Sequence, residues 1–157
     1  MPQLQQAQQL QEFVNEVFEA AKDSWVAQTR AKTKGHTELT ETEFLALDIL
    51  AQSEQTLTVG EIQKQIGVLP AQMSRVIRSL ENKGEKSLVA CNINAEDKRK
   101  IDVELTPAGR NAHQAYRQMK LGSIQQSLEN LSEHDLSEFM RILRRIRENV
   151  RKAPSPK

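Results

Sequence analysis

The chain has 157 residues, enough for one domain, and only 4% of them are aromatic. So few aromatic residues argue against a large β-sandwich core and favour a helical fold with polar surfaces. No apolar run approaches the roughly 20 residues that span a bilayer, and the N-terminus MPQLQQAQQL lacks the basic start and apolar centre of a signal peptide. One cysteine makes neither an internal disulfide nor a cysteine-based zinc site. These features predict a cytoplasmic protein without a membrane partner.

The formal net charge of +1 hides an uneven distribution along the chain. Residues 1–58 carry four Lys or Arg against nine Asp or Glu, residues 70–100 carry seven against four, and residues 141–157 carry seven against one. A positive middle is typical of a surface that faces a polyanion, but solvated helix faces carry similar charge runs. The motifs have to decide between the two interpretations.

Two helices are predicted in the first third of the chain. Apolar residues recur every three or four positions from Leu10 to Trp25, which predicts an amphipathic helix over about 5–31 that ends in the loop 32–35. Thr40 and Glu43 form a candidate capping box for the second helix. The inner face of this second helix is expected to hold Phe44, Leu45, Leu47, Ile49 and Leu50.

A pair of short helices follows. Thr58 and Glu61 form another candidate capping box, and the helix that they open ends near Gly67. Pro70 suits the first position of the next helix, which runs to the stop at residues 82–84. Met73, Val76, Ile77 and Leu80 of this helix are expected in the core. The spacing predicts a helix-turn-helix.

The stretch after this pair indicates a β-hairpin. Two runs able to pair as strands, 88–93 and 101–105, flank a polar tip that carries Asp97, Lys98, Arg99 and Lys100. Thr106 and Pro107 then begin another helix, Thr as the N-cap and Pro at the first helical position. A basic hairpin that follows a helix-turn-helix is typical of a winged helix. We therefore predict a mainly α fold with a small β-hairpin wing, the winged helix-turn-helix occupying residues 39–106.

Two long helices complete the chain. One is predicted from Pro107 to about Leu131, with an irregularity at Gly122, and the other begins at Ser132 and Asp135 and runs to Val150. Residues 152–157 are predicted to be a disordered tail. The helices over 5–31 and 107–150 carry more apolar surface than the winged helix can cover. We expect them to form a dimerisation region, about 8–30 and 124–150, in a homodimer; the alternative is that they fold back on their own domain.

Candidate DNA contacts lie on the second helix of the pair and on the wing. In a helix-turn-helix the first residues of the second helix meet base edges in the major groove. The residues on or near this leading face are Ala71, Gln72, Ser74, Arg75 and Arg78. Gln72 suits adenine and Arg75 suits guanine, whereas Ser74 and Arg78 suit phosphates.

On the wing, Arg99 is placed to enter the minor groove. Asp97 is expected to hold Arg99 or the loop backbone by a charge-assisted hydrogen bond, and Lys98 and Lys100 to attract phosphates. A solvated charged turn is the alternative interpretation of this tip.

The spacing of these residues resembles the MarR family, the multiple-antibiotic-resistance repressors. The matching pattern is Leu39-Thr40-x-x-Glu43-Phe44, Asn82-Lys83-Gly84, Leu88-Val89, Asp97-x-Arg99 and Leu105-Thr106-x-x-Gly109, and the resemblance covers about residues 5–150. It implies a homodimer of winged helices, joined by its terminal helices, on a pseudo-palindromic operator in double-stranded DNA. It also implies that small anionic or aromatic effectors, or cysteine oxidation in some members, weaken DNA binding.

The chain departs from the family pattern at two places in the approach to the wing. Glu85, Lys86 and Ser87 lengthen the turn that leads into the wing, and Cys91 replaces the usual Arg. Both departures concern the pose of the wing.

Other functions follow from particular residues. Cys91 makes a redox-sensing regulator an alternative, with Lys98 to Lys100 as nearby cations. A winged-helix adaptor for protein contacts, without specific DNA binding, is the other alternative. The three histidines are scattered, with no metal-ligand spacing, and neither a Gly-rich phosphate loop nor a serine nucleophile motif is present. We therefore expect no enzyme, no catalytic residues, no metal and no cofactor.

The effector cannot be named from the sequence. The family's usual ligand site is a cleft between the dimerising helices and the winged domain. The candidate effector-binding residues are Trp25, Arg30, His36 and Tyr116.

Overall fold

The computed structural model describes residues 2–30 and 38–154, apart from the side chain of Ser123. The chain divides into two units, one of residues 1–27 and 121–157 and the other of residues 28–120. None of the described helices is long and apolar enough to span a membrane.

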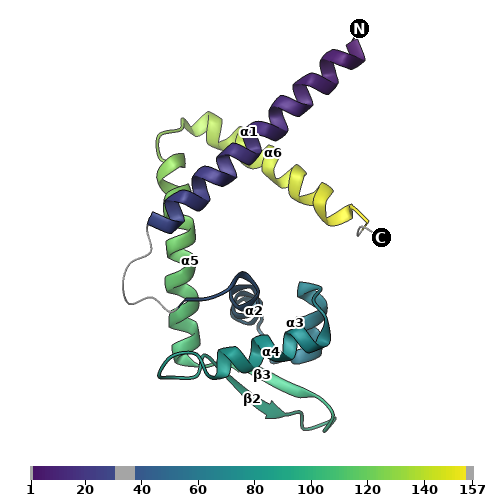
Figure 1. Ribbon diagram of the computed structural model, residues 1–157, viewed down its shortest axis with the longest axis vertical. Coiled ribbons are helices and arrows are strands. Elements are labelled where there is room, and N and C mark those ends of the chain that lie inside the picture. The colour runs from purple at the N-terminus through teal and green to yellow at the C-terminus, as the bar shows by residue number, and fades with distance from the viewer. Residues whose placement is uncertain (1, 31–37, 155–157) are drawn as a thin grey trace. The chain divides into compact units, whose positions relative to one another are not determined.

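The second unit contains a helix-turn-helix and a three-stranded sheet (Figure 1). Its elements are α2 (Glu41–Gln52), β1 (Leu57–Thr58), α3 (Val59–Ile66), α4 (Pro70–Glu81), β2 (Val89–Ile93), β3 (Ile101–Leu105) and the first part of α5 (Pro107–Leu128). The strands are antiparallel in the order β1–β3–β2. This arrangement confirms the predicted winged helix-turn-helix, and β1, which pairs with β3 through only two residues, is an element that the sequence did not reveal.

Local capping decides where the helices of this unit begin. The Thr40 hydroxyl accepts a hydrogen bond from the Glu43 amide at 3.2 Å, and the Glu43 carboxylate accepts one from the Thr40 amide at 3.3 Å. Thr58 and Glu61 repeat this reciprocal pair at the start of α3 with distances of 3.2 and 2.9 Å. Gly67, with φ of 85°, ends α3 in the left-handed conformation that glycine adopts readily. Both predicted capping boxes are confirmed.

The core of this unit lies between the helices and the sheet. Its buried side chains are Leu39, Ala46, Leu47, Leu50, Ile62, Met73, Ile77, Leu80, Leu88, Val89 and Val103. One expectation for α2 was wrong: Leu45 is 46% exposed, whereas Glu43 is almost fully buried. The helical phase that buries Ala46, Leu47 and Leu50 turns Leu45 outward, and Glu43 is accepted inside because its carboxylate finds partners there.

The base of the wing is anchored on both sides despite the longer turn. The Leu88 amide donates to the Leu80 carbonyl at 3.0 Å, and the Thr106 amide donates to the Leu88 carbonyl at 3.2 Å. The Thr106 hydroxyl donates to the Ser87 carbonyl at 2.6 Å. Despite the inserted residues 85–87, the residue before β2 is thus bonded both to α4 and to the residue before α5.

The first unit consists of helices with exposed apolar faces. It contains most of α1 (Pro2–Arg30), the end of α5 and α6 (Glu133–Lys152), and no residue of α1 or α6 is buried. Ser132 caps α6 by accepting from the Asp135 amide at 3.1 Å, as predicted. Helix α5 runs through Gly122 without a break and ends at Leu128, three residues earlier than expected, while α6 extends to Lys152, which the sequence assigned to the tail.

Candidate nucleic-acid interface

Helix α4 presents a polar face to solvent because its apolar face is used for packing. Met73, Ile77 and Leu80 are buried and Val76 packs against the core. The five predicted contact residues of this helix, Ala71, Gln72, Ser74, Arg75 and Arg78, are all exposed.

The wing tip is ordered by Asp97. The Asp97 carboxylate accepts hydrogen bonds from the Arg99 amide at 3.0 Å, from Arg99 Nε at 3.1 Å and from Arg99 Nη2 at 3.2 Å. These bonds from Arg99 hold the pKa of the Asp97 carboxyl below its ordinary value. The Arg99 side chain is 90% exposed. Asp97 thus makes both predicted contacts, to the Arg side chain and to the loop backbone.

Asn94 is a second organiser of the tip, one that sequence reasoning missed. Its side-chain oxygen accepts from the amides of Glu96 at 3.0 Å and Asp97 at 2.9 Å, and its amide nitrogen donates to Asp102 at 2.9 Å. An Asn that bonds the backbone two and three residues ahead is a common turn former, so its position at the end of a predicted strand was an available signal.

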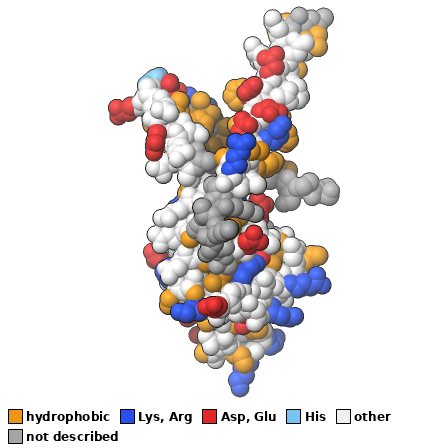
Figure 2. Space-filling model, turned by 60° about the vertical axis from the view of Figure 1, so that its left-hand side comes forward, with side chains coloured by type: hydrophobic (Ala, Val, Ile, Leu, Met, Phe, Trp, Pro, Cys, Tyr) orange, Lys and Arg blue, Asp and Glu red, His pale blue; other side chains and the backbone are white. Residues whose placement is uncertain are grey.

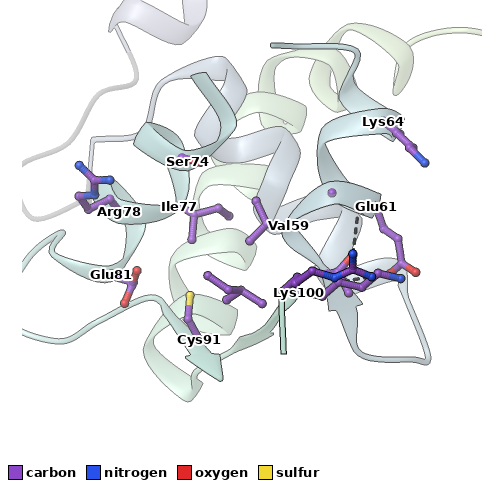
Figure 3. A pocket seen from close by; sticks show the side chains of 13 residues that line it. Val59, Glu61, Lys64, Ser74, Ile77, Arg78, Glu81, Cys91 and Lys100 are labelled. Atoms are coloured by element: carbon purple, nitrogen blue, oxygen red, sulfur yellow. Dashed lines mark hydrogen bonds between the residues drawn. The ribbon is translucent and has the colours of Figure 1, made fainter. Parts of the chain in front are cut away.

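A groove of about 650 Å³ lies between α3, α4 and the wing (Figure 3). Ser74 and Arg78 of α4 line it together with Arg99 and Lys100 of the wing. Lys64 of α3 also lines it and was not among the predicted contacts. Tertiary structure thereby joins four of the predicted residues on one surface, whereas Ala71, Gln72, Arg75, Asp97 and Lys98 do not line this groove.

Cys91 lies in the same groove, where the charge that acts on its thiol is negative. Figure 3 shows its sulfur directed into the groove from β2, with Glu81 close by. Burial raises the pKa of the Cys91 thiol to about 11, and the charge of Glu81 and a hydrogen bond to its carboxylate add to the increase. Of the cations expected within reach of this thiol, Arg99 and Lys100 line the same groove, but the charge that shifts the pKa of the thiol is the carboxylate of Glu81.

The candidate effector residues are divided between the two units, with Trp25 in the first and Arg30 and Tyr116 in the second. The Tyr116 ring packs on Phe44 with centroids 4.8 Å apart, and the Lys120 ammonium lies 5.3 Å from the Tyr116 ring centre. Trp25 is exposed on α1 in the other unit, and Arg30 is exposed at the end of α1. His36 lies outside the described residues. Within residues 2–30 and 38–154 no cluster of His, Cys, Asp and Glu side chains suits a metal ion.

The fold and this basic surface define a winged-helix transcriptional regulator. Residues 39–101 match the model of the MarR family, so the resemblance inferred from the sequence is confirmed. No curated protein sequence matches the chain.

Solved structures support the same fold. A MarR family protein from Bacillus stearothermophilus is 20% identical and matches 92% of this chain and 97% of its own with a TM-score of 0.75. Streptococcus pneumoniae FabT, solved in complex with DNA, is 15% identical. The match covers 92% of this chain and 96% of FabT, with a TM-score of 0.71. Bordetella bronchiseptica BpsR, whose DNA binding is regulated by 6-hydroxynicotinic acid, is 19% identical. The match covers 86% of this chain and 98% of BpsR, with a TM-score of 0.61.

Proposed function

We propose that this protein is a sequence-specific DNA-binding repressor that acts as a homodimer and is released from its operator by a small effector. The observation that carries the proposal is the groove in which Ser74 and Arg78 of α4 face Arg99 and Lys100 of the wing. Figure 2 shows Lys and Arg side chains on the surface of the winged-helix unit.

Each contact has a separate role in this proposal. Gln72 and Arg75, near the start of α4, read adenine and guanine in the major groove. Ser74 and Arg78 bind phosphates and orient the helix without reading sequence. Arg99, exposed and held by Asp97, enters the minor groove beside the half-site.

Apolar faces of the first unit support a homodimer. Phe13, Val17 and Trp25 of α1 and Phe139 and Ile146 of α6 are each 46–66% exposed. Figure 2 shows hydrophobic side chains at the surface of the helices of this unit. A second copy of the chain can cover such faces, because a two-fold axis brings the same surface patch of both subunits into contact. Two winged helices then meet half-sites roughly 34–36 Å apart.

An effector completes the proposed repressor cycle. The chemical precedent is BpsR, which responds to an aromatic acid. Trp25, Arg30, His36 and Tyr116 remain the candidate contacts. Tyr116 offers an aromatic face with the Lys120 cation beside it, a combination that suits an anionic aromatic ring.

Footprinting of the purified protein on the DNA upstream of its own gene tests the proposal. We expect a protected pseudo-palindrome and an affinity that falls steeply as salt rises, since bound counterions are released from phosphates. Binding that shows neither protection nor salt dependence would favour the adaptor alternative.

Substitutions on α4 test the division of roles. Arg75→Ala is expected to cost about 1–3 kcal/mol on the operator and to relax base preference at one position in each half-site. Arg78→Ala is expected to weaken all sequences alike. Titrations of both variants against operator and random duplexes measure the difference. Wild-type affinity of both variants for both duplexes would show that α4 is not the recognition helix.

A further inference from the structure

Glu43 does more than cap α2. Its side chain is only 5% exposed, yet it is an ionised acid. Besides the Thr40 amide, the carboxylate accepts hydrogen bonds from the Lys83 ammonium at 2.7 and 2.5 Å and from the Ser79 hydroxyl at 3.4 Å. Ser79 belongs to the last turn of α4, and Lys83 follows that helix directly. One carboxylate therefore joins the start of α2 to the end of the recognition helix.

The second capping box shows that this junction is not needed for capping. Glu61 makes the same reciprocal bonds with Thr58 but is exposed, and no ion pair to a Lys or Arg is seen at Glu61 among the described residues. Burying a charge costs desolvation free energy that an ion pair only partly regains, so stability alone gives little reason to bury Glu43 against the partly exposed Lys83. Buried ion pairs can instead select one arrangement of the elements that they join.

Lys83 lies at the entry of the lengthened turn to the wing. Gly84 follows it with φ of 74°, and the turn ends where the Leu88 amide donates to the Leu80 carbonyl at 3.0 Å. The Glu43 contact thus holds the entry of the turn, and the Leu88 and Thr106 bonds hold its exit. Without the contact at Lys83, residues 82–87 would lose their tie to α2.

We propose that Glu43 is a positioning residue for DNA recognition: through Lys83 and Ser79 it sets the orientation of α4 relative to the wing. The inference rests on the proposed function only where DNA affinity is measured. Glu43 touches no DNA in this scheme, and it acts on base recognition through the residues that it holds.

Three variants separate the ion pair from the cap. Glu43→Gln keeps an oxygen for the Thr40 amide but removes the charge; Lys83→Met removes the cation; Lys83→Arg keeps it. Glu43→Gln and Lys83→Met are expected to lower the ratio of operator affinity to random-duplex affinity about tenfold, a loss typical of one misplaced base contact. Lys83→Arg is expected to retain most of the wild-type ratio. Glu61→Gln, which alters the other capping box, controls for the loss of a capping carboxylate in thermal unfolding.

The pH dependence provides a signature that a simple loss of packing lacks. Burial raises the pKa of Glu43, but the hydrogen bonds from Lys83 and Thr40 outweigh it, so the pKa lies below its ordinary value. The wild-type junction is therefore intact above the ordinary carboxyl pKa and is lost as the pH falls through the lowered one. The other charged groups nearby, Glu41 on α2 and Lys120 on α5, pair with each other at 3.8 Å. In Lys83→Met and in Glu43→Gln the ion pair is already absent, so neither variant should show the loss of operator specificity that the wild type shows as the pH falls through the lowered pKa of Glu43.

Amide hydrogen exchange tests the inference without DNA. The Leu88 and Asn82 amides are expected to exchange about tenfold faster in Glu43→Gln than in the wild type, a change in local opening rather than in global unfolding. Unchanged exchange together with unchanged DNA specificity in Glu43→Gln and Lys83→Met would overturn the role of Glu43. Faster exchange in a protein that binds no specific DNA would support the junction and refute the proposed function instead.

Discussion

Single polar side chains organise the exposed tip of the wing. Asn94 and Asp97 bond backbone amides of the turn, and Asp97 also holds the Arg99 guanidinium. An exposed arginine would otherwise sample many rotamers, and ordering it on binding costs conformational entropy. Because Asp97 already holds Arg99 in the free protein, part of that cost is met before binding, although Asp97 adds a negative charge to the surface proposed to bind phosphates.

Replacing Asp97 distinguishes order from charge. Asp97→Ala is expected to weaken operator binding because the turn and Arg99 lose their anchor. Glu96→Ala is the matched control, since it removes the same charge one residue away, whereas the turn hydrogen bonds of Glu96 described above are made by its backbone amide and not by its side chain. Charge counting predicts tighter binding for both variants. Titration at several salt concentrations decides, and tighter binding of Asp97→Ala throughout would show that the wing is not pre-organised by this carboxylate.

Cys91 is expected to be a poor redox sensor. A pKa raised to about 11 leaves far less thiolate at pH 8 than the ordinary value near 9 does. Alkylation by iodoacetamide should therefore be about 100-fold slower than for an unperturbed thiol, since two pKa units change the thiolate fraction by that factor. Glu81→Gln should speed the reaction by removing the neighbouring charge. Rapid modification of the wild type, with loss of operator binding, would revive the redox alternative.

At the scale of elements, α5 begins against the backbone of the segment that enters the wing. A Cβ added at Gly109 would lie 1.9 Å from the Leu88 carbonyl oxygen and 2.8 Å from its carbon. Glycine is needed here for space rather than for an unusual φ. The contact ties the position of α5 to the base of β2, the same place that the Thr106 bonds hold.

Gly109→Ala tests this contact against helix propensity. Alanine would favour a helix by roughly 0.5–1 kcal/mol, but overpacking against a fixed carbonyl costs about 1–3 kcal/mol, so the variant should be less stable. Gly60→Ala, also in the first turn of a helix of this unit, meets only Thr58 Oγ1 at 3.9 Å and should be neutral or stabilising. Urea unfolding of the pair measures the difference. Equal stability of both variants would mean that α5 can shift away from Leu88.

At the scale of the whole molecule, the apolar faces of α1 and α6 require a partner in the proposed homodimer. Leu143→Asp combined with Ile146→Asp should give monomers or unfolded chain, since an unpaired charge buried at the interface costs several kcal/mol. Arg144→Asp with Arg145→Asp is the control on the polar side of the same helix. Light scattering at micromolar concentration reports the mass, and a wild-type mass of one chain would exclude the dimer.

Local signals in the sequence determined most helix starts and stops of the winged helix. Thr40 with Glu43, Thr58 with Glu61, and Pro70 act on backbone groups within three or four residues, so they can be read without a fold. The wing contact between Asp97 and Arg99 spans two residues and was predictable for the same reason.

Only the tertiary structure decided which distant side chains meet. Glu43 and Lys83 are 40 residues apart, and β1 joins the sheet through β3, which comes more than 40 residues later. The place of Glu81 beside Cys91 likewise depends on how α4 lies over β2. Periodicity ranks positions on one element but carries no information about the element packed against it. For that reason the exposed face of α4 could be predicted from the sequence, whereas the junction between Glu43 and Lys83 could not.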